Sequence, residues 1–248
     1  MSGIDVTFSA LKWDTNFFKV SCAKVVLRKP VSEDTWNELK KKFADYQFVS
    51  IENRNSEPKN AQLIGKDTHA FLADVNIQLS KKVSRKSSLL ENIQIYQALE
   101  YNEEVLELGK FHFYKFIEDP ELAKRGGEQV YRQWMINSFG KKDKYYALFF
   151  NEKNRIDGFL LFSFRDSLCL IELIAVSGAS SNRGIGSNLI NAVEFKAYQD
   201  HCDEIQVGTQ VRNHIAINFY HKVGFKQTGC HQIYHLWQLS KKGDQEAI

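Results

Sequence analysis

Two short segments of this 248-residue chain carry residue types that could bind an anion and donate a proton. The first is a loop, SGASSNRGIG, which spans residues 177–186 and leads into a predicted helix over about residues 186–199. Backbone N–H groups at a helix start have no internal partner, and the helix dipole adds a partial positive charge there. Arg183 could add a full positive charge, and Gly184 and Gly186 let phosphate groups approach the backbone closely. The loop therefore predicts a phosphate site, with a flexible turn that binds nothing as the alternative.

The second segment, NHIAINFYHKVGF, spans residues 213–225 and has the pattern of a helix. Asn213 and Tyr220 are seven residues apart, about two helical turns, so both should lie on one face. A tyrosine hydroxyl can donate its proton to a leaving group in general acid catalysis. The alternative is that Tyr220 is a packing residue with its hydroxyl at the surface.

The elements around these two segments predict an α/β fold with a largely antiparallel sheet. An apolar run at residues 168–176 precedes the loop, and another at residues 204–210 follows the helix. Because a helix connects these two runs, they should form parallel neighbouring strands. Residues 144–150 and 156–164 are separated by a short turn and should form a hairpin that continues into the strand at residues 168–176.

A smaller α/β unit is expected ahead of this domain. Ser32 should cap a helix whose apolar stripe consists of Trp36, Leu39 and Phe43. The segment KKVSRKSSLLE is charged, contains serines and lacks periodicity, so it is the best domain boundary. We therefore expect a unit at residues 1–85 and a domain at residues 86–248. The other elements expected in the first unit are strands at residues 20–26, 46–52 and 70–79 and a helix at residues 60–64.

The middle and the end of the chain are less regular. Residues 115–127 should form a loop, because Pro120 and two glycines interrupt regular structure there. FKQTG and HQIYHLWQL, near the end of the chain, should form a closing pair of strands. The remaining expected elements are a strand at residues 93–99 and helices at residues 103–113 and 128–139.

The composition, 43% hydrophobic and 25% charged, is typical of a soluble globular protein. The net charge of +3 is weak, and the basic run KKVSRK is more typical of a solvated linker than of a nucleic-acid site. No apolar run approaches the ~20 residues that span a bilayer, and the N-terminus lacks a signal-peptide pattern. We therefore expect a cytoplasmic protein that binds neither nucleic acid nor membrane. Its scattered cysteines and histidines predict reduced thiols and no metal site.

Together, the two segments resemble the GNAT superfamily of acyl-CoA N-acyltransferases. Residues 174–176 (IAV) and the following SGASSNRGIGSNLI resemble the strand–loop–helix motif of the family, Arg/Gln-x-x-Gly-x-Gly/Ala. The pattern N-x-x-A-x-x-F-Y-x-x-x-G-F, which begins at Asn213, resembles the other diagnostic segment. The chain departs from the first motif at Ser181, which removes one long side chain near the phosphates. The resemblance implies a GNAT fold, with a mostly antiparallel sheet flanked by helices, and acetyl-CoA as cosubstrate.

The resemblance also implies roles for individual residues. Backbone N–H groups near the strand end at residues 174–176 would stabilise an oxyanion. Tyr220 would act as general acid toward the departing thiolate, and Asn213 would contact the coenzyme A arm. The residues expected to bind coenzyme A are Ile174, Ala175, Val176, Ser181, Asn182, Arg183, Gly184, Ile185, Gly186, Ser187 and Asn213.

A second resemblance is to the TDP-fucosamine acetyltransferases of the WecD type, which N-acetylate a TDP-linked 4-amino-4,6-dideoxy sugar for a surface polysaccharide. It rests on LKWDTNFF near the N-terminus, GKFHFYKFIEDP, YRQW, and GTQVRN ending at Asn213. It implies a nucleotide amino sugar as acceptor and an N-terminal unit that contributes to the acceptor cleft. The expected substrate contacts are Asp74, His112 and Trp134. The alternatives are an edge or turn position for Asp74, burial for His112 and core packing for Trp134.

Other functions remain open at this point. The acceptor amine could belong to a protein N-terminus, a polyamine or an amino acid, and Ser181 leaves open a coenzyme A-binding module without turnover. No general base is evident apart from Asp74, and a water chain could take its place. The resemblance to the family also raises the expectation of a homodimer.

Overall fold

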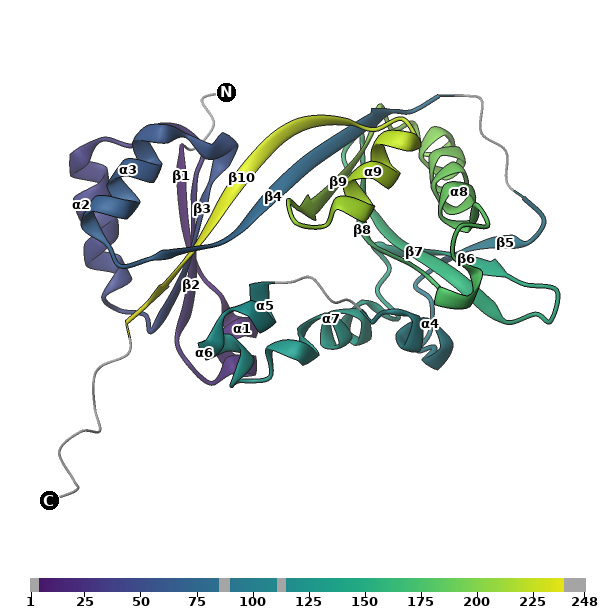
Figure 1. Cartoon of the computed structure of the whole chain (residues 1–248), viewed down its shortest axis with the longest axis horizontal. Coiled ribbons are helices and arrows are strands. Elements are labelled where there is room, and N and C mark those ends of the chain that lie inside the picture. Colours follow the sequence, from purple (N-terminus) through teal and green to yellow (C-terminus); the bar gives the residue numbers. More distant parts are fainter. Residues whose placement is uncertain (1–4, 85–89, 111–114, 239–248) are drawn as a thin grey trace, which may run out of the picture. The chain divides into compact units, whose positions relative to one another are not determined.

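The chain forms two compact units in the computed structural model, which describes residues 5–84, 90–110 and 115–238 (Figure 1). The first unit consists of residues 1–76, 115–127 and 229–248, and the second of residues 77–114 and 128–228. Two strands, β4 (Phe71–Lys82) and β10 (Lys226–Trp237), each pass from one unit into the other along the chain. The first unit therefore includes residues 115–127 and 229–248. The expected boundary at residue 85 would assign both of these segments to the second domain.

The sheet of the first unit has the strand order β1-β2-β3-β10. Only β2 and β3 are parallel. Helices α2 (Glu33–Phe43) and α3 (Pro58–Asp67) cover one face (Figure 1), where Trp36, Leu39 and Phe43 are buried as expected. Ser32 caps α2 by accepting a hydrogen bond from the Thr35 N–H, a contact worth about 1 kcal/mol. The first three strands span Val6–Ala10, Cys22–Leu27 and Phe48–Asn53.

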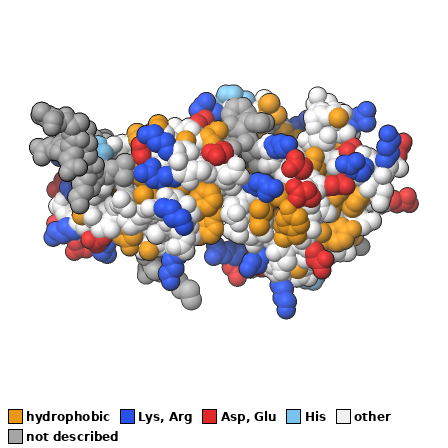
Figure 2. All heavy atoms as spheres, turned by 90° about the horizontal axis from the view of Figure 1, so that it is seen from below, with side chains coloured by type: hydrophobic (Ala, Val, Ile, Leu, Met, Phe, Trp, Pro, Cys, Tyr) orange, Lys and Arg blue, Asp and Glu red, His pale blue; other side chains and the backbone are white. Residues whose placement is uncertain are grey.

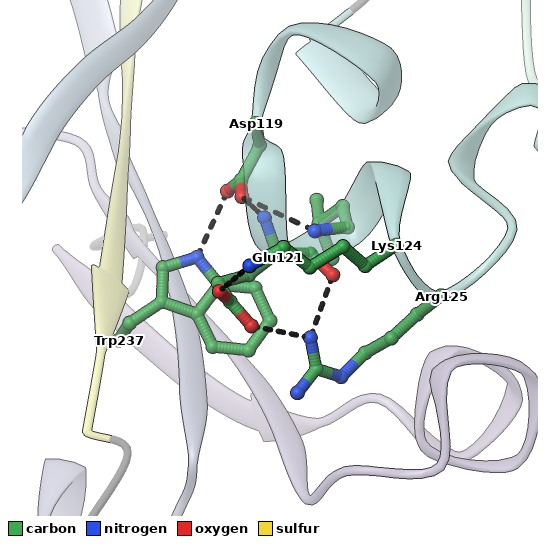
Figure 3. Close-up of polar contacts among 6 residues, drawn as sticks. Asp119, Glu121, Lys124, Arg125 and Trp237 are labelled. Atoms are coloured by element: carbon green, nitrogen blue, oxygen red, sulfur yellow. Dashed lines mark hydrogen bonds and ion pairs between the residues drawn. The ribbon is translucent and has the colours of Figure 1, made fainter. Parts of the chain in front are cut away.

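The expectation of a loop at residues 115–127 is wrong, because the segment contains helices α5 (Lys115–Glu118) and α6 (Pro120–Ala123). Pro120 occupies the first helical position, where its missing N–H removes no hydrogen bond. Asp119 caps α6 by accepting from the backbone N–H groups of Glu121 and Leu122, at 2.9 and 3.2 Å. Its other oxygen accepts from Trp237 Nε1 at 2.9 Å (Figure 3). Helix α1 (Lys12–Phe18) belongs to the same unit.

The second unit has the strand order β9-β8-β7-β6-β5. Strands β5 to β8 are antiparallel and β8 pairs with β9 in parallel, so the predicted hairpin and the predicted crossover are both confirmed. Helices α4 (Glu103–Leu108) and α7 (Val130–Ser138) pack on one face, and α8 (Ile185–Gln199) on the other. The strands β5 to β9 span Ile93–Gln97, Lys144–Phe150, Ile156–Arg165, Leu168–Val176 and Glu204–Gln210. In the described parts of the two units, short 3₁₀ helices cover Arg54–Ser56, Gly127–Gln129 and Gly178–Ser180.

Two further expectations differ from the structure. The expected closing pair of strands is the single strand β10, because the chain stays extended through Gly229. Helix α4 ends at Leu108 rather than at residue 113, and residues 111–114 lie outside the described part of the chain. Among the described residues, no helix is both long and apolar enough to cross a bilayer. On the face drawn in Figure 2, Lys and Arg are interspersed with Asp and Glu among the described side chains.

Candidate functional site

The loop before α8 offers a row of free backbone donors. Asn182 and Gly184 both have left-handed backbone conformations, with φ of 64° and 80°. Turns of this kind direct successive N–H groups to one side and form anion-binding concavities. The N–H groups from Asn182 to Ser187 donate no hydrogen bond within the described part of the chain. Ser181, Asn182, Arg183 and Gly184 are all exposed, so these donors can be reached from solvent.

The two glycines of the loop, Gly184 and Gly186, have different surroundings. A Cβ atom on Gly184 would meet nothing within 4 Å, so open space lies above this backbone. A Cβ atom on Gly186 would lie 3.1 Å from the ring of Phe219 and 4.0 Å from Val176. Gly186 therefore brings the end of β8, the start of α8 and helix α9 (His214–Lys222) together at one point. Open space thus lies beside Gly184, whereas Gly186 packs against Phe219; that both glycines let phosphates approach the backbone stays a prediction.

The loop is anchored from the neighbouring strand. Ser180 Oγ donates to Asp157 Oδ2 at 2.7 Å, and the Ser177 N–H donates to the Asp157 carbonyl at 2.8 Å. A cavity of about 550 Å³ adjoins this anchor. Lining residues include Phe149, Phe150, Lys153, Ser180, Arg183 and Ile185. Sequence reasoning missed Asp157, because no local pattern links residue 157 to a loop twenty residues later.

The end of β8 is open on one side. Strand β8 pairs with β9 only over Leu168–Ile171, while it stays paired with β7 as far as Val176. Glu172 is an extra residue in β8, since Leu161 pairs with Leu173 and Phe162 with Ile171. Such a bulge bends a strand and increases its twist. The backbone of Ile174, Ala175 and Val176 therefore has no β9 partner, which leaves that side of the strand open.

Asn213 and Tyr220 lie in the same unit as the loop. The Asn213 side chain caps α9, because its Oδ1 accepts from the Ala216 N–H at 3.1 Å. Asn213 thus precedes the helix rather than sharing a face with Tyr220, and its amide N–H₂ remains available. The Tyr220 side chain is 3% exposed and lies against the rings of Phe219 and Phe225. Its hydroxyl makes no hydrogen bond within the described residues, and burial raises the pKa of this phenol.

The three expected substrate contacts fall in different places. Trp134 is 39% exposed and stacks on Tyr131 at 5.8 Å between ring centroids, which excludes the core-packing alternative. Gln210, the last residue of β9, donates to the Tyr131 hydroxyl at 3.5 Å, so this aromatic pair adjoins the second unit's sheet. Asp74 is a half-buried residue of β4 and belongs to the first unit. His112 lies outside the described residues.

A general base is not obvious beside the loop. Glu172, at the bulge of β8, is the acidic residue nearest to the open strand end along the chain. Its carboxylate is paired with Lys144 and accepts a hydrogen bond from Ser163, so these contacts already occupy it. Within the described residues, no group of three His, Cys, Asp or Glu side chains is placed to hold a metal ion.

Part of the second unit matches a known protein family. Residues 105–225 match the family described as Acetyltransferase (GNAT) family. A solved GCN5-related N-acetyltransferase from Kribbella flavida superimposes with a TM-score of 0.61 at 10% identity, covering 94% of this chain and 88% of that chain. Such low identity supports a common fold alone, and it confirms the predicted GNAT fold.

Two curated relatives match shorter stretches. The spore coat polysaccharide biosynthesis protein SpsD of Bacillus subtilis is 26% identical over 138 residues, 54% of this chain and 47% of that protein. The N-alpha-acetyltransferase 30 of Saccharomyces cerevisiae is 36% identical over 55 residues, 22% of this chain and 31% of that protein. The chain therefore matches less than half the length of either relative.

Proposed function

We propose that this chain is an acetyl-CoA-dependent N-acetyltransferase, because its residues 105–225 match the Acetyltransferase (GNAT) family. Its acceptor is the amine of a nucleotide-linked amino-dideoxy sugar, with TDP as the nucleotide, in the synthesis of a surface polysaccharide. The assignment of acetyl-CoA as the acetyl donor rests on the row of unused backbone N–H groups from Asn182 to Ser187. Open space lies above Gly184, within this row.

The pyrophosphate of acetyl-CoA binds to this row. Backbone N–H groups at a helix start suit a phosphate, and the exposed Arg183 adds a charge-assisted contact. Ser181 supplies no long side chain, so the backbone carries most of the affinity. The free amide N–H₂ of Asn213 donates to the pantetheine arm, while its oxygen stays in the cap of α9.

Transfer of the acetyl group uses the open end of β8 and Tyr220. The acceptor nitrogen bonds to the carbonyl carbon of the thioester, and N–H groups of Ile174 to Val176 stabilise the negative charge on the carbonyl oxygen. The carbon–sulfur bond then breaks, and Tyr220 gives its proton to the thiolate. The hydroxyl carries this proton at neutral pH, because the ordinary pKa of tyrosine is about 10 and burial raises the pKa of Tyr220 above that value. Solvent takes the proton that the amine loses and reprotonates Tyr220.

Two observations support a sugar as the acceptor. SpsD is described as a polysaccharide biosynthesis protein, which fits a sugar acceptor. Trp134 is exposed and stacks on the half-buried Tyr131, and flat aromatic rings are suitable surfaces for sugars and bases. Asp74 and His112 remain proposed substrate contacts. The TDP-fucosamine acetyltransferase type, a cytoplasmic location and a homodimer likewise remain predictions.

A protein N-terminus is the second candidate acceptor, because the yeast relative is described as an N-alpha-acetyltransferase. Thiol release from acetyl-CoA separates the two. We expect release with TDP- or UDP-linked amino sugars and none with peptides that have free N-termini. Release with peptides or simple amines alone would make the sugar assignment wrong. No release with any amine, together with acetyl-CoA binding, would favour a binding module without turnover.

A further inference from the structure

The cavity of about 550 Å³ beside the donor loop has walls from two segments that are distant in the chain. Arg183 and Ile185 line it from the loop and the start of α8, and Glu152 and Lys153 line it from the turn that joins β6 to β7. All four residues belong to the second unit. Small-molecule sites in proteins are concave and have volumes of ~300–1,000 Å³, so this cavity has room for a nucleoside.

Hydrogen bonds hold the two walls of the cavity together. The Asp157 carboxylate bridges them, since one oxygen accepts from Ser180 Oγ at 2.7 Å and the other from Asn151 Nδ2 at 2.9 Å. Asn151 Oδ1 in turn accepts from the backbone N–H groups of Lys153 and Arg155, at 2.9 and 3.1 Å. The turn that carries Lys153 is therefore fixed relative to the loop before a ligand arrives, and a preorganised site loses less entropy on binding.

The cavity presents charged and polar side chains that are free within the described part of the chain. The Lys153 ammonium and the Arg183 guanidinium are exposed and form no ion pair or hydrogen bond with any described residue. The Glu152 carboxylate and the Asn92 side-chain amide are exposed and equally free there. The half-buried Phe149 adds an aromatic ring. This set of groups is complementary to a phosphorylated nucleoside, which offers a phosphate, hydrogen-bond donors and acceptors, and a flat base.

The cavity and the open strand end lie on opposite sides of β8. The neighbours of β8 in the sheet are β9 on one side and β7 on the other. The end of β8 is open on the β9 side, whereas the cavity adjoins the hairpin of β7 and β6. A ligand whose pyrophosphate lies on the row of N–H groups after β8 can therefore extend one arm to each side.

We propose that this cavity binds the adenosine 3′-phosphate part of coenzyme A, with Lys153 on the 3′-phosphate and the adenine against Phe149. The inference rests on the proposed function and concerns the arm of the donor that takes no part in the chemistry. The pantetheine arm runs from the pyrophosphate to the open end of β8, so the adenosine arm is left for the other side. Arg183 and Ile185 belong both to the row of N–H groups and to the cavity wall, which joins the two subsites. An ammonium is a donor-only group that suits phosphate oxygens.

The test compares coenzyme A with 3′-dephospho-coenzyme A, which differs only in lacking the 3′-phosphate. Both are titrated calorimetrically into the full chain, and neither carries an acetyl group, so no transfer takes place. We expect coenzyme A to bind about tenfold more tightly, because the dephospho form lacks one charge-assisted contact. Lys153→Gln should weaken the binding of coenzyme A about tenfold and leave that of the dephospho form unchanged. Lys153→Arg should keep the preference for coenzyme A.

Lys141→Gln is the matched control. Lys141 is an exposed lysine just before β6, at the opposite end of that strand from the turn that carries Lys153. This variant should bind both forms as the unchanged chain does. A general effect of removing one positive charge would instead appear in both variants.

A second titration separates coenzyme A from a free nucleotide as the ligand of the cavity. Adenosine 3′,5′-bisphosphate has the same phosphorylated nucleoside as coenzyme A. It should give no binding heat once the chain is saturated with coenzyme A, because the cavity is then filled. Binding heat under that condition would show a separate nucleotide site and overturn the proposal.

Three results of the first titration would also overturn the proposal. They are equal affinity of the unchanged chain for the two forms, an undiminished preference in Lys153→Gln, and equal weakening of both forms in that variant. The outcome is separable from that of the proposed function. A preference that depends on Lys153, without acetyl transfer to any amine, removes the activity and keeps this site. Acetyl transfer by a chain that binds both forms equally does the reverse.

Discussion

Gly186 lies against Phe219 so closely that an added Cβ atom would come within 3.1 Å of the phenyl ring. This contact holds the start of α8 beside α9, which carries Tyr220. The same added atom would lie 4.0 Å from Val176, at the open end of β8. One glycine thus sets the positions of the donor loop, the strand end and the proposed general acid relative to one another.

Gly186→Val should therefore lower both stability and turnover. The larger side chain must displace Phe219 or the helix start, which costs about 1–3 kcal/mol of unfolding free energy. The KM for acetyl-CoA should rise at the same time, because the N–H groups move. Gly178→Val is the control, since a Cβ atom on Gly178 meets nothing within 4 Å and its φ is not positive. Urea unfolding and thiol release check both effects; equal values for the two variants would contradict the packing role.

Arg183→Gln should raise the KM for acetyl-CoA about five- to tenfold, because it removes a charged partner of the pyrophosphate. S-acetylpantetheine lacks the pyrophosphate, so its KM should not change in the variant. Arg165→Gln, at the exposed last residue of β7, serves as the control. A similar rise in KM with both donors would place Arg183 outside the phosphate site.

Ser181→Arg should lower the KM for acetyl-CoA severalfold. Ser181 is exposed at the turn before α8, where the family motif has a long polar side chain. An arginine there adds a second charged contact to the phosphates. Steady-state kinetics at varied acetyl-CoA measure the change, with Ser181→Ala as a control that should stay near the original value. An unchanged or higher KM in Ser181→Arg would mean that the phosphates bind elsewhere.

Acid should destabilise the first unit through the buried pair of His235 and Asp119, in which Nδ1 lies 2.6 Å from Oδ2. Burial lowers the pKa of His235. The unfolded chain therefore takes up a proton near the ordinary imidazole pKa of about 6.5, before the folded chain does, and stability falls as the pH drops through that value. Burial alone would raise the pKa of Asp119, but the hydrogen bonds from His235 and Trp237 outweigh it and lower the pKa. That contribution is lost at still lower pH, as the folded carboxyl titrates.

Urea unfolding at pH 7.5 and 5.5 tests this dependence. The unchanged chain should lose stability between the two values. His235→Gln should be less stable at pH 7.5 by about 1–3 kcal/mol and should show a weaker pH dependence. His214→Gln, an exposed position of α9, should keep the original dependence. If His235→Gln also kept the original pH dependence of stability, the pair of His235 and Asp119 would not cause that dependence.

Much of the second unit follows from local patterns. The apolar runs, the small-residue loop and the helix after it form one contiguous stretch, and each element depends mainly on nearby residues. Ser32 likewise acts as a cap through a partner only three residues away. The prediction of a loop around Pro120 was wrong because proline can either end a helix or begin one. The cap that Asp119 forms shows that a helix begins here.

The rest depends on contacts between distant segments. Phe219 contacts Gly186, and Asp157 holds Ser180, but neither pair has a spacing that a local pattern can signal. A local sequence pattern also cannot show that Lys24, Glu52 and His231 lie on one face of the first unit's sheet. Lys24, Glu52 and His231 come from strands far apart in the chain, and only their registers place them on one side.

We propose that the second unit transfers an acetyl group with Tyr220 as the general acid. The most direct test is the kcat of Tyr220→Phe with acetyl-CoA and the amine identified by thiol release, beside Tyr198→Phe at an exposed position of α8. We expect Tyr220→Phe to lower kcat by about a hundredfold or more and to leave the KM for acetyl-CoA within about twofold, because only the proton donor is lost. Tyr198→Phe should be unaffected. A kcat for Tyr220→Phe equal to that of the unchanged chain would show that Tyr220 is not the general acid.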